Sequence, residues 1–461
     1  MSRSVSVLSP LRADRAKSES RRDVHLAREA ALNSKGRGVA VLAAGLVLLT
    51  LPACAQAPVP PPKPAPAAAT SADEAGGPAF SAWLRALKAE ARQRGISEAT
   101  LARAFRDVAP NPRVLELDRR QPEFTSTFWG YYDRAVSPDR VRDGRAMLAR
   151  HRALLDDLYR RTGIPPQVIV AFWGVETNYG RNLGGFNVIE ALATLAHDAR
   201  RGAFFREQLL TALAILDQGH IAPETMVGSW AGAMGQMQFM PTTFRDHAVD
   251  GDGDGRKDIW TDLKDAFESA AGFLTDLGWR ADQTWGRQVR LPPGFDLTQS
   301  DLDVRKPLTD WAALGVARAD GQALPVVPGM TASLLLPAGH EGPAFLVYDN
   351  FRVIMRWNNS SLYALAVGRL ADRIAGDGSL VGVFDRAPDP LRYSELRTLQ
   401  HLLNHLGFEA GPVDGLAGPS TRSAIRRFQA TQGLPADGHA DPALLRHVQR
   451  LAAGQGSDGG L

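Results

Sequence analysis

The sequence predicts a mainly α-helical protein of the α+β class, with a small β insertion and a separate three-helix module near its C-terminus. Three observations lead to this prediction. Apolar residues recur at helical spacing from Phe80 onward. Between about 285 and 350, prolines, glycines and short apolar runs replace that spacing and indicate strands and loops. A second set of helical repeats follows the proline-containing break at 385–390.

Length and composition set the broad class of the protein. A chain of 461 residues has room for about two or three domains. Charged residues make up 22% and hydrophobic residues 44%, as in ordinary soluble globular proteins. The formal net charge is +3, and no basic patch is interleaved with aromatic residues. We therefore expect no nucleic-acid partner, and we expect a monomer.

The first 79 residues differ from the rest. Gly38 to Leu51 is an apolar run too short to cross a bilayer comfortably, and it is typical of a signal-peptide core. It ends just before Cys54, the only cysteine, in a stretch that resembles a lipoprotein cleavage box. Residues 1–54 are therefore predicted to be an N-terminal extension and signal peptide, with lipidation at Cys54. Cleavage between Ala53 and Ala57 is the alternative, and it would give a soluble exported protein. The Ala/Pro-rich stretch 55–79 predicts an extended linker.

The main domain is predicted to cover residues 80–385. Ser97 precedes an amphipathic stretch and predicts a helix start, because serine side chains cap the first turn of a helix. Pro165 and Pro166 predict the start of the helix that carries Glu176, since proline is tolerated in a first turn. The other expected elements are helices near 80–91, 139–162, 190–218 and 361–374, and strands at 332–336 and 344–348.

The C-terminal module is predicted to cover residues 391–452. Leucines from Leu396 to Leu406 give one amphipathic helix, and residues 421–431 give a second. Gly-rich turns separate them, and a last short helix ends near Leu451. About 60 residues with so little apolar area predict a small module of modest stability.

Glu176 is the main candidate for chemistry. It lies deep in the apolar stretch Pro166–Gly180, where a charged carboxylate would be costly. Burial raises the pKa of a carboxyl group, and a protonated acid in an apolar pocket can deliver a proton to a leaving oxygen. A structural glutamate that bonds buried backbone groups is the alternative.

A stretch rich in glycine, methionine and glutamine follows at 228–241. Its glycines would let a ligand approach the backbone closely, and Ser229 and Gln238 would hydrogen-bond its polar groups. The alternative is close packing of helices through small residues, which would explain Ala231, Ala233 and Gly235.

A third motif begins at Asp250. Oxygen-bearing residues Asp250, Asp252 and Asp254, followed by Gly255, match the start of an EF-hand-like loop. Position 12 of that loop is Thr261 and not glutamate, which predicts a structural calcium site of modest affinity in the Asp250–Asp258 loop. An Asp/Gly turn without metal is the alternative.

These motifs together resemble the B-type lytic murein transglycosylases. The resemblance rests on residues 174–181, 228–241 and 355–360, in that order along the chain. The tail resembles the three-helix peptidoglycan-binding module through residues 399–404, 411–415 and 421–429. The two resemblances are independent, and both indicate peptidoglycan as the polymer that the protein binds.

The resemblance implies a lysozyme-like helical catalytic domain and a function. The enzyme would cleave the MurNAc–GlcNAc β-1,4 bond of peptidoglycan and form 1,6-anhydro-MurNAc ends. The conspicuous motif holds one carboxylate, so Glu176 would act first as acid and then as base, while the 6-hydroxyl of the substrate attacks. A lysozyme-type muramidase and a non-catalytic wall-binding scaffold are the alternatives.

The resemblance also implies further site residues and a location. Tyr131, Asn358 and Tyr363 would bind substrate, although the family often has tyrosine where this chain has Trp357. Asp265 and the backbone carbonyl of Arg256 would complete the calcium site. The enzyme is expected in the periplasm, anchored to the outer membrane through Cys54, with a soluble periplasmic form as the alternative.

Overall fold

The structure is a computed structural model, and it describes residues 77–120, 127–198, 200–384, 386 and 391–457. The signal peptide, the Ala/Pro-rich linker and Cys54 were predicted within residues 1–79, and all but the last residues of that stretch lie outside the described ones. Among the described residues, no helix is both long and apolar enough to cross a membrane.

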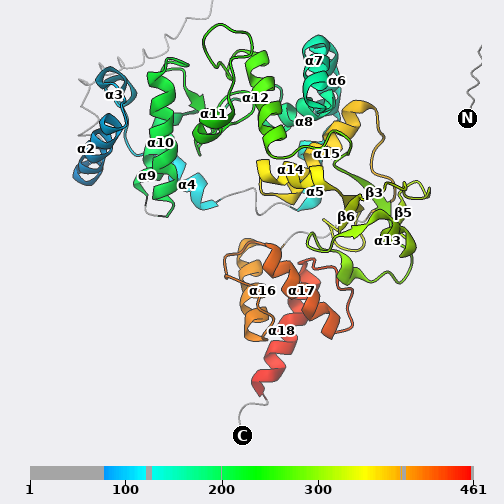
Figure 1. Ribbon diagram of the computed structural model, residues 1–461. Coiled ribbons are helices and arrows are strands. Elements are labelled where there is room, and N and C mark those ends of the chain that lie inside the picture. The colour runs from blue at the N-terminus through cyan, green and yellow to red at the C-terminus, as the bar shows by residue number, and fades with distance from the viewer. Residues whose placement is uncertain (1–76, 121–126, 199, 385, 387–390, 458–461) are drawn as a thin grey trace, which may run out of the picture. The chain divides into compact units, whose positions relative to one another are not determined.

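Helices form most of the main domain, as predicted (Figure 1). In order they are α2 (Gly77–Gln93), α3 (Glu98–Ala104), α4 (Pro112–Arg120), α5 (Phe128–Ala135), α6 (Pro138–Arg150), α7 (Arg152–Thr162), α8 (Pro166–Thr177), α9 (Val188–His197), α10 (Gly202–Asp217), α11 (Pro241–His247), α12 (Leu263–Asp276), α13 (Leu308–Ala313), α14 (Asp349–Trp357) and α15 (Ser361–Ala375). Two of the predicted starts are confirmed by side-chain caps: Ser97 accepts from the backbone of Thr100, and Ser360 from that of Tyr363.

Two of the expected helices are each two helices. The stretch predicted at 139–162 breaks at His151, which ends α6 and begins α7 with φ −104° and ψ 22°. The stretch predicted at 190–218 breaks after His197, where Asp198 takes an extended conformation. The apolar spacing continues across both breaks, because the separate helices bury their faces in the same core.

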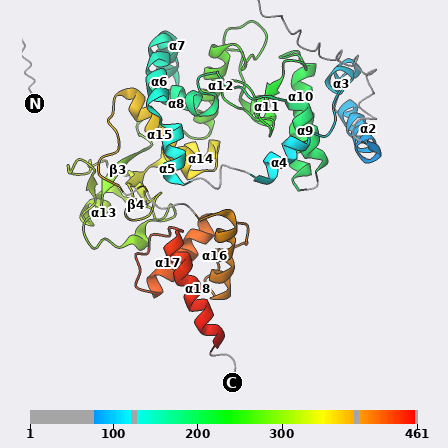
Figure 2. The same cartoon turned by 180° about the vertical axis from the view of Figure 1, so that it is seen from behind.

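Helix α8 lies inside this core. Most of its residues are buried, and Ile169, Val170 and Phe172 are fully inaccessible. A helix that is apolar on all sides is stable only when other elements surround it. Helices α6, α7, α12 and α15 provide that cover, and Figures 1 and 2 show α8, α14 and α15 close together in both views.

The β insertion is an antiparallel sheet with strand order β4-β6-β7-β3-β5. Its strands are β3 (Gly286–Arg290), β4 (Lys306–Pro307), β5 (Ala317–Arg318), β6 (Thr331–Leu335) and β7 (Ala344–Val347), with a 3-10 turn η2 (Leu297–Gln299). The two strands predicted from sequence are β6 and β7. Trp311 of α13 is fully buried against this sheet, and its indole N–H donates to the carbonyl of Ala332 at 3.0 Å.

Trp285 joins the insertion to α15. Its ring packs on Gly368, where a Cβ atom would come within 2.3 Å of the indole, and its N–H donates to Asp372 at 3.1 Å. Burial raises the pKa of Asp372 to about 6, and Arg369 and Trp285 offset part of that rise. Glycine at 368 is therefore required for close approach of the sheet to the helix.

The C-terminal module is a three-helix unit, as predicted. It contains α16 (Tyr393–His405), α17 (Pro419–Thr431) and α18 (Pro442–Ser457), and α18 extends beyond its predicted end near Leu451. Leu399, Leu403, Ile425, Phe428 and Val448 form a separate core for this module.

The main domain also contains a short two-stranded ribbon, in which β1 (Phe186–Asn187) pairs with β2 (Val227–Gly228). This ribbon leads into the 228–241 motif.

Candidate active site

Glu176 is held at the C-terminal end of α8. The helix ends in a left-handed turn in which Asn178, Tyr179 and Gly180 have φ of 50°, 62° and 77°. Such a conformation is costly for a tyrosine and persists only where contacts fix it. The Tyr179 hydroxyl donates to the carbonyl of Arg140 at 2.7 Å, and burial raises the pKa of Tyr179. The turn lies two residues after Glu176 and therefore fixes the place where the glutamate leaves the helix.

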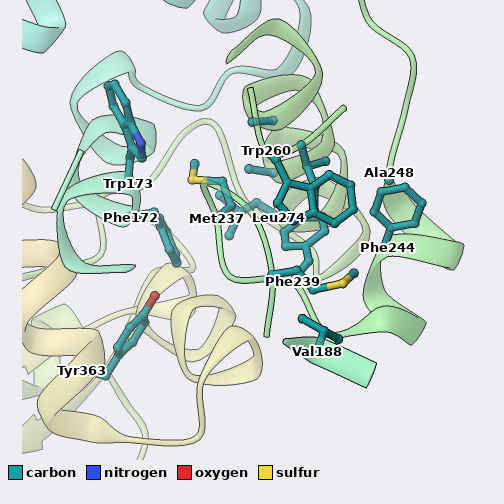
Figure 3. Close-up of a cluster of buried hydrophobic side chains, with 14 of the residues drawn as sticks. Phe172, Trp173, Val188, Met237, Phe239, Phe244, Ala248, Trp260, Leu274 and Tyr363 are labelled. Atoms are coloured by element: carbon teal, nitrogen blue, oxygen red, sulfur yellow. The ribbon is translucent and has the colours of Figure 1, made fainter. Parts of the chain in front are cut away.

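The carboxylate of Glu176 accepts two hydrogen bonds at one oxygen. The Tyr363 hydroxyl donates to Oε1 at 2.5 Å, and the Trp357 indole N–H donates to the same atom at 3.0 Å. Tyr363 is buried, and Figure 3 shows its hydroxyl directed toward Phe172 of α8. Tyr363 was predicted to bind substrate. The structure places it, with Trp357, against the predicted catalytic carboxylate.

The 228–241 motif folds as a compact turn and not as a helix. Isolated β-bridges join Gly228 to Met234 and Met234 to Phe239. A Cβ atom at Gly228 would lie 2.2 Å from the carbonyl oxygen of Ala233, and Gly235 has φ +70°. The expectation that small residues pack helices together here is therefore wrong, because the glycines serve a tight backbone turn.

Ser229 and Gln238 both lie in this turn. The Ser229 hydroxyl accepts from the backbone of Ala231 at 3.3 Å and of Ala233 at 3.0 Å. Gln238 has φ 49°, and its side-chain amide donates to the carbonyls of Leu183 and Gly235. Both side chains therefore shape the turn in this structure, and any substrate contact would come from their remaining hydrogen-bonding capacity.

Gln236 was not predicted as a site residue, yet it connects the site. Its side chain is buried, accepts from the Trp173 indole at 2.7 Å and donates to the carbonyl of Trp260 at 2.8 Å. Its own carbonyl accepts from the Thr177 hydroxyl at 2.9 Å. The turn is thus bonded to α8 on both sides of Glu176. The signal in the sequence was a glutamine between two methionines, Met234 and Met237, since a buried amide needs partners.

Asn358 and Tyr131 are the other two residues predicted to bind substrate. Asn358 ends α14 directly after Trp357, and its backbone N–H donates to Ile354 at 3.1 Å. Tyr131 lies on α5, half-buried against the main core, and interacts electrostatically with Arg140. Of the predicted substrate residues, the structure brings Tyr363 into contact with Glu176 and Asn358 next to it through Trp357.

The aspartate loop lies between the 228–241 turn and α12. Carboxylate oxygens of Asp250, Asp252 and Asp254 lie within 4.8 Å of one another. Backbone N–H groups of the loop, that of Gly255 first, hold the pKa of Asp250 below its usual value. Three convergent carboxylates are a donor set that suits a hard divalent cation such as calcium.

Asp265, predicted as a further metal ligand, lies against the backbone of this loop. It is 1% exposed, and its two oxygens accept from the backbone of Gly251 at 2.7 Å and Asp258 at 2.6 Å. Burial raises the pKa of Asp265, and these backbone bonds offset part of the rise. Arg256 pairs its guanidinium with Asp254 at 3.2 Å. Asp250, Asp252 and Asp254 thus suit the predicted cation, and Asp265 holds the backbone of the loop.

Comparison with known proteins assigns the family. Residues 79–372 match the model of the transglycosylase SLT domain. The chain belongs to the transglycosylase SLT family. Residues 392–448 match a peptidoglycan binding domain.

Three relatives of this transglycosylase are informative. Membrane-bound lytic murein transglycosylase B of Escherichia coli (strain K12) is 34% identical over 252 residues, which are 53% of this chain and 66% of that protein. The crystal structure of SltB3 from Pseudomonas aeruginosa in complex with NAG-anhNAM-pentapeptide has a TM-score of 0.78 and 49% identity, and covers 81% of this chain and 100% of that one. The Escherichia coli lytic transglycosylase Slt35 in complex with calcium has a TM-score of 0.56 and 28% identity, with 65% and 93% covered.

The arrangement in this transglycosylase suits acid and base work by one group. Glu176 is half-buried, fixed in position by two donors, and attached to a helix that is itself bonded to the 228–241 turn. A carboxylic acid so held can protonate a leaving oxygen and then accept a proton as a carboxylate. The family assignment and the geometry of Glu176 therefore agree.

Proposed function

We propose that the protein is a lytic transglycosylase that cleaves the MurNAc–GlcNAc β-1,4 bond of peptidoglycan and leaves 1,6-anhydro-MurNAc ends, for cell-wall turnover and remodelling. The observation that carries the proposal is the geometry of Glu176, whose Oε1 is fixed by Tyr363 and Trp357. The SltB3 relative, 49% identical, was crystallised with a ligand that contains an anhydro sugar, which supports the same reaction here.

The reaction needs one protein carboxyl group. Glu176, as the acid, gives its proton to the glycosidic oxygen while the bond from that oxygen to C1 of MurNAc breaks. Glu176, now a carboxylate, takes the proton of the MurNAc 6-hydroxyl as that oxygen bonds to C1. The acid is thereby regenerated, and no water is consumed.

The mass of the products tests this proposal. We expect digestion of purified sacculi to release muropeptides about 18 Da lighter than the hydrated ones, because no water is added across the bond. Lysozyme digestion of the same sacculi gives the hydrated masses for comparison. Hydrated products alone would assign the chain to the muramidases, and no soluble product at all would favour a wall-binding scaffold.

The C-terminal module, residues 391–452, binds the same polymer in this proposal and keeps the catalytic domain on the wall. Its match to a peptidoglycan binding domain supports that role.

The protein acts in the periplasm as a monomer, anchored to the outer membrane through lipidated Cys54. The intact mass of the mature protein should show a lipid-modified Cys54, and an unmodified start between Ala53 and Ala57 would instead mean a soluble form.

The aspartate loop binds calcium in this proposal, as a structural ion and not a participant in the reaction. Asp250, Asp252 and Asp254 would hold it, and the calcium complex of Slt35 supports a site in this family. Calcium would stiffen the loop that ends at Trp260, whose carbonyl Gln236 binds.

Calcium should raise the melting temperature of the main domain, because an ion that binds only the folded state stabilises it by mass action. Titration followed by thermal shift measures the effect, with EDTA to reverse it. Asp254→Asn should abolish the shift. Asp303→Asn, which changes an exposed aspartate in the β insertion, should retain it. An equal shift in melting temperature in both variants would show that calcium does not bind at this loop.

A further inference from the structure

Trp357, whose indole donates to Glu176, is packed among phenylalanine rings. Its indole ring lies among three phenylalanine rings from three parts of the chain: Phe172 of α8 at 4.6 Å, Phe273 of α12 at 5.0 Å and Phe239 of the 228–241 turn at 5.4 Å between centroids. Figure 3 shows Phe172 and Phe239 among the side chains of a buried hydrophobic cluster. An indole packed on three sides cannot turn its N–H away from Glu176 without displacing the core.

The two donors to Oε1 differ in what they allow. A phenol hydroxyl rotates and can either donate or accept, whereas an indole N–H only donates. If the proton of the neutral acid lay on Oε1, Tyr363 could reverse its hydroxyl and accept that proton. Trp357 could only continue to donate, and the hydroxyl oxygen of a carboxylic acid is a weaker acceptor than its carbonyl oxygen. Trp357 therefore favours Oε1 as the carbonyl oxygen of the neutral acid.

We propose that Trp357 is a positioning residue that favours Oε1 of Glu176 as the accepting oxygen and so places the transferable proton on Oε2. The inference follows because a carboxyl group has two oxygens and a donor held at one of them disfavours protonation of that one. It deepens the proposed function and rests on Glu176 being the acid. In that reaction Oε2 loses its proton to the glycosidic oxygen as the bond to C1 breaks. The same Oε2 then takes the proton from the 6-hydroxyl as the new bond to C1 forms.

The proposal has a consequence for both halves of the reaction. A single oxygen acts as acid and as base, so the leaving oxygen and the attacking hydroxyl must reach the same side of the carboxyl group. Without Trp357 the proton would distribute over both oxygens, and the molecules that carry it on Oε1 could not deliver it.

Infrared difference spectroscopy locates the proton directly. The spectrum of the wild-type protein minus that of Glu176→Gln, at a pH where Glu176 is protonated, isolates its C=O stretch. In the wild type, Oε1 is the carbonyl oxygen and accepts two hydrogen bonds. We expect Trp357→Phe, which keeps an aromatic ring among the three phenylalanines, to shift this band to higher frequency because one bond is lost.

The same variant should change the kinetics. Turnover should fall about tenfold, the effect of a lost hydrogen bond to a charged group. The alkaline limb of the pH–turnover profile should move to higher pH, because the carboxylate loses a donor that favours its charged form. Tyr348→Phe is the matched control, because it removes a buried hydroxyl that accepts from Arg287 at 2.6 Å in the β insertion. This variant should change neither the C=O stretch of Glu176 nor the alkaline limb of the pH–turnover profile.

A measurement on the wild-type protein keeps the proposal testable if Trp357→Phe does not fold. One indole N–H resonance in the ¹⁵N spectrum should titrate with Glu176, stop titrating in Glu176→Gln, and remain hydrogen-bonded at both ends of the titration. A resonance that moves to the position of a free indole at low pH would overturn the proposal, as would an unchanged C=O band in Trp357→Phe. Hydrated products from the wild type would instead contradict the transglycosylase reaction and leave the proton on Oε2.

Discussion

Glu176→Gln should lower turnover on purified sacculi by a factor on the order of 10³ to 10⁴, because the amide can neither give nor take the proton. The side chain keeps its size, and its carbonyl oxygen can still accept from Trp357 and Tyr363, so the fold should persist. Release of soluble muropeptides, followed by chromatography, measures the loss. Thermal unfolding close to that of the wild type would show that chemistry and not folding has been removed.

Glu224→Gln is the control for this substitution. Glu224 precedes the 228–241 turn by a few residues and forms an exposed ion pair with Arg103. Its loss should leave turnover nearly unchanged, since exposed pairs contribute little. Full activity in Glu176→Gln would remove Glu176 from the reaction and return it to the alternative of a structural glutamate.

Gly184→Ala should destabilise the main domain by about 3 kcal/mol and lower its melting temperature by about 5–10 °C. Gly184 has φ +104°, and a Cβ atom there would lie 1.9 Å from the carbonyl oxygen of Gly228 and 2.7 Å from the nitrogen of Ser229. Both contacts are with backbone, so relief requires the two chains to separate. The ribbon of β1 and β2 would open, and the turn that carries Ser229 would shift.

Gly185→Ala tests the same chemical change one residue later. A Cβ atom at Gly185 would meet nothing within 4 Å, and its φ is not in the left-handed region. We expect its melting temperature to stay close to that of the wild type, and its activity with it. Equal losses in the two variants would mean that general loop entropy, and not the approach of Gly184 to Gly228, sets the effect.

The sequence was sufficient to predict those features of the fold that depend on neighbouring residues. The caps at Ser97 and Ser360, the start at Pro166 and the strands β6 and β7 follow from residues within a few positions of each other. The breaks at His151 and after His197 were missed because apolar residues recur at helical spacing on both sides of each break. The packing of the separate helices on one core determines where the helices break, and the periodicity of apolar residues in the sequence does not reveal these positions.

The site divides in the same way. Glu176 was found because a carboxylate in an apolar run is visible in the sequence. Its contact with Tyr363 joins residues 187 positions apart, so nothing nearby could reveal that the tyrosine serves the acid. The resemblance implied Asp265 as a metal ligand, and the structure adds that its oxygens accept from the backbone of the loop. Residue type thus predicted which groups matter, and tertiary contacts decided what they do.

The buried side chain of Gln236 has a consequence for how this site can change during evolution. It accepts from the indole N–H of Trp173 and donates to the backbone carbonyl of Trp260, and a buried polar group that loses its partner costs free energy. Leucine or methionine at 236 would leave two partners unsatisfied at once, and glutamate would place a negative charge against a carbonyl. Single substitutions are therefore blocked, and in related sequences we expect positions 173 and 236 to vary only as a pair.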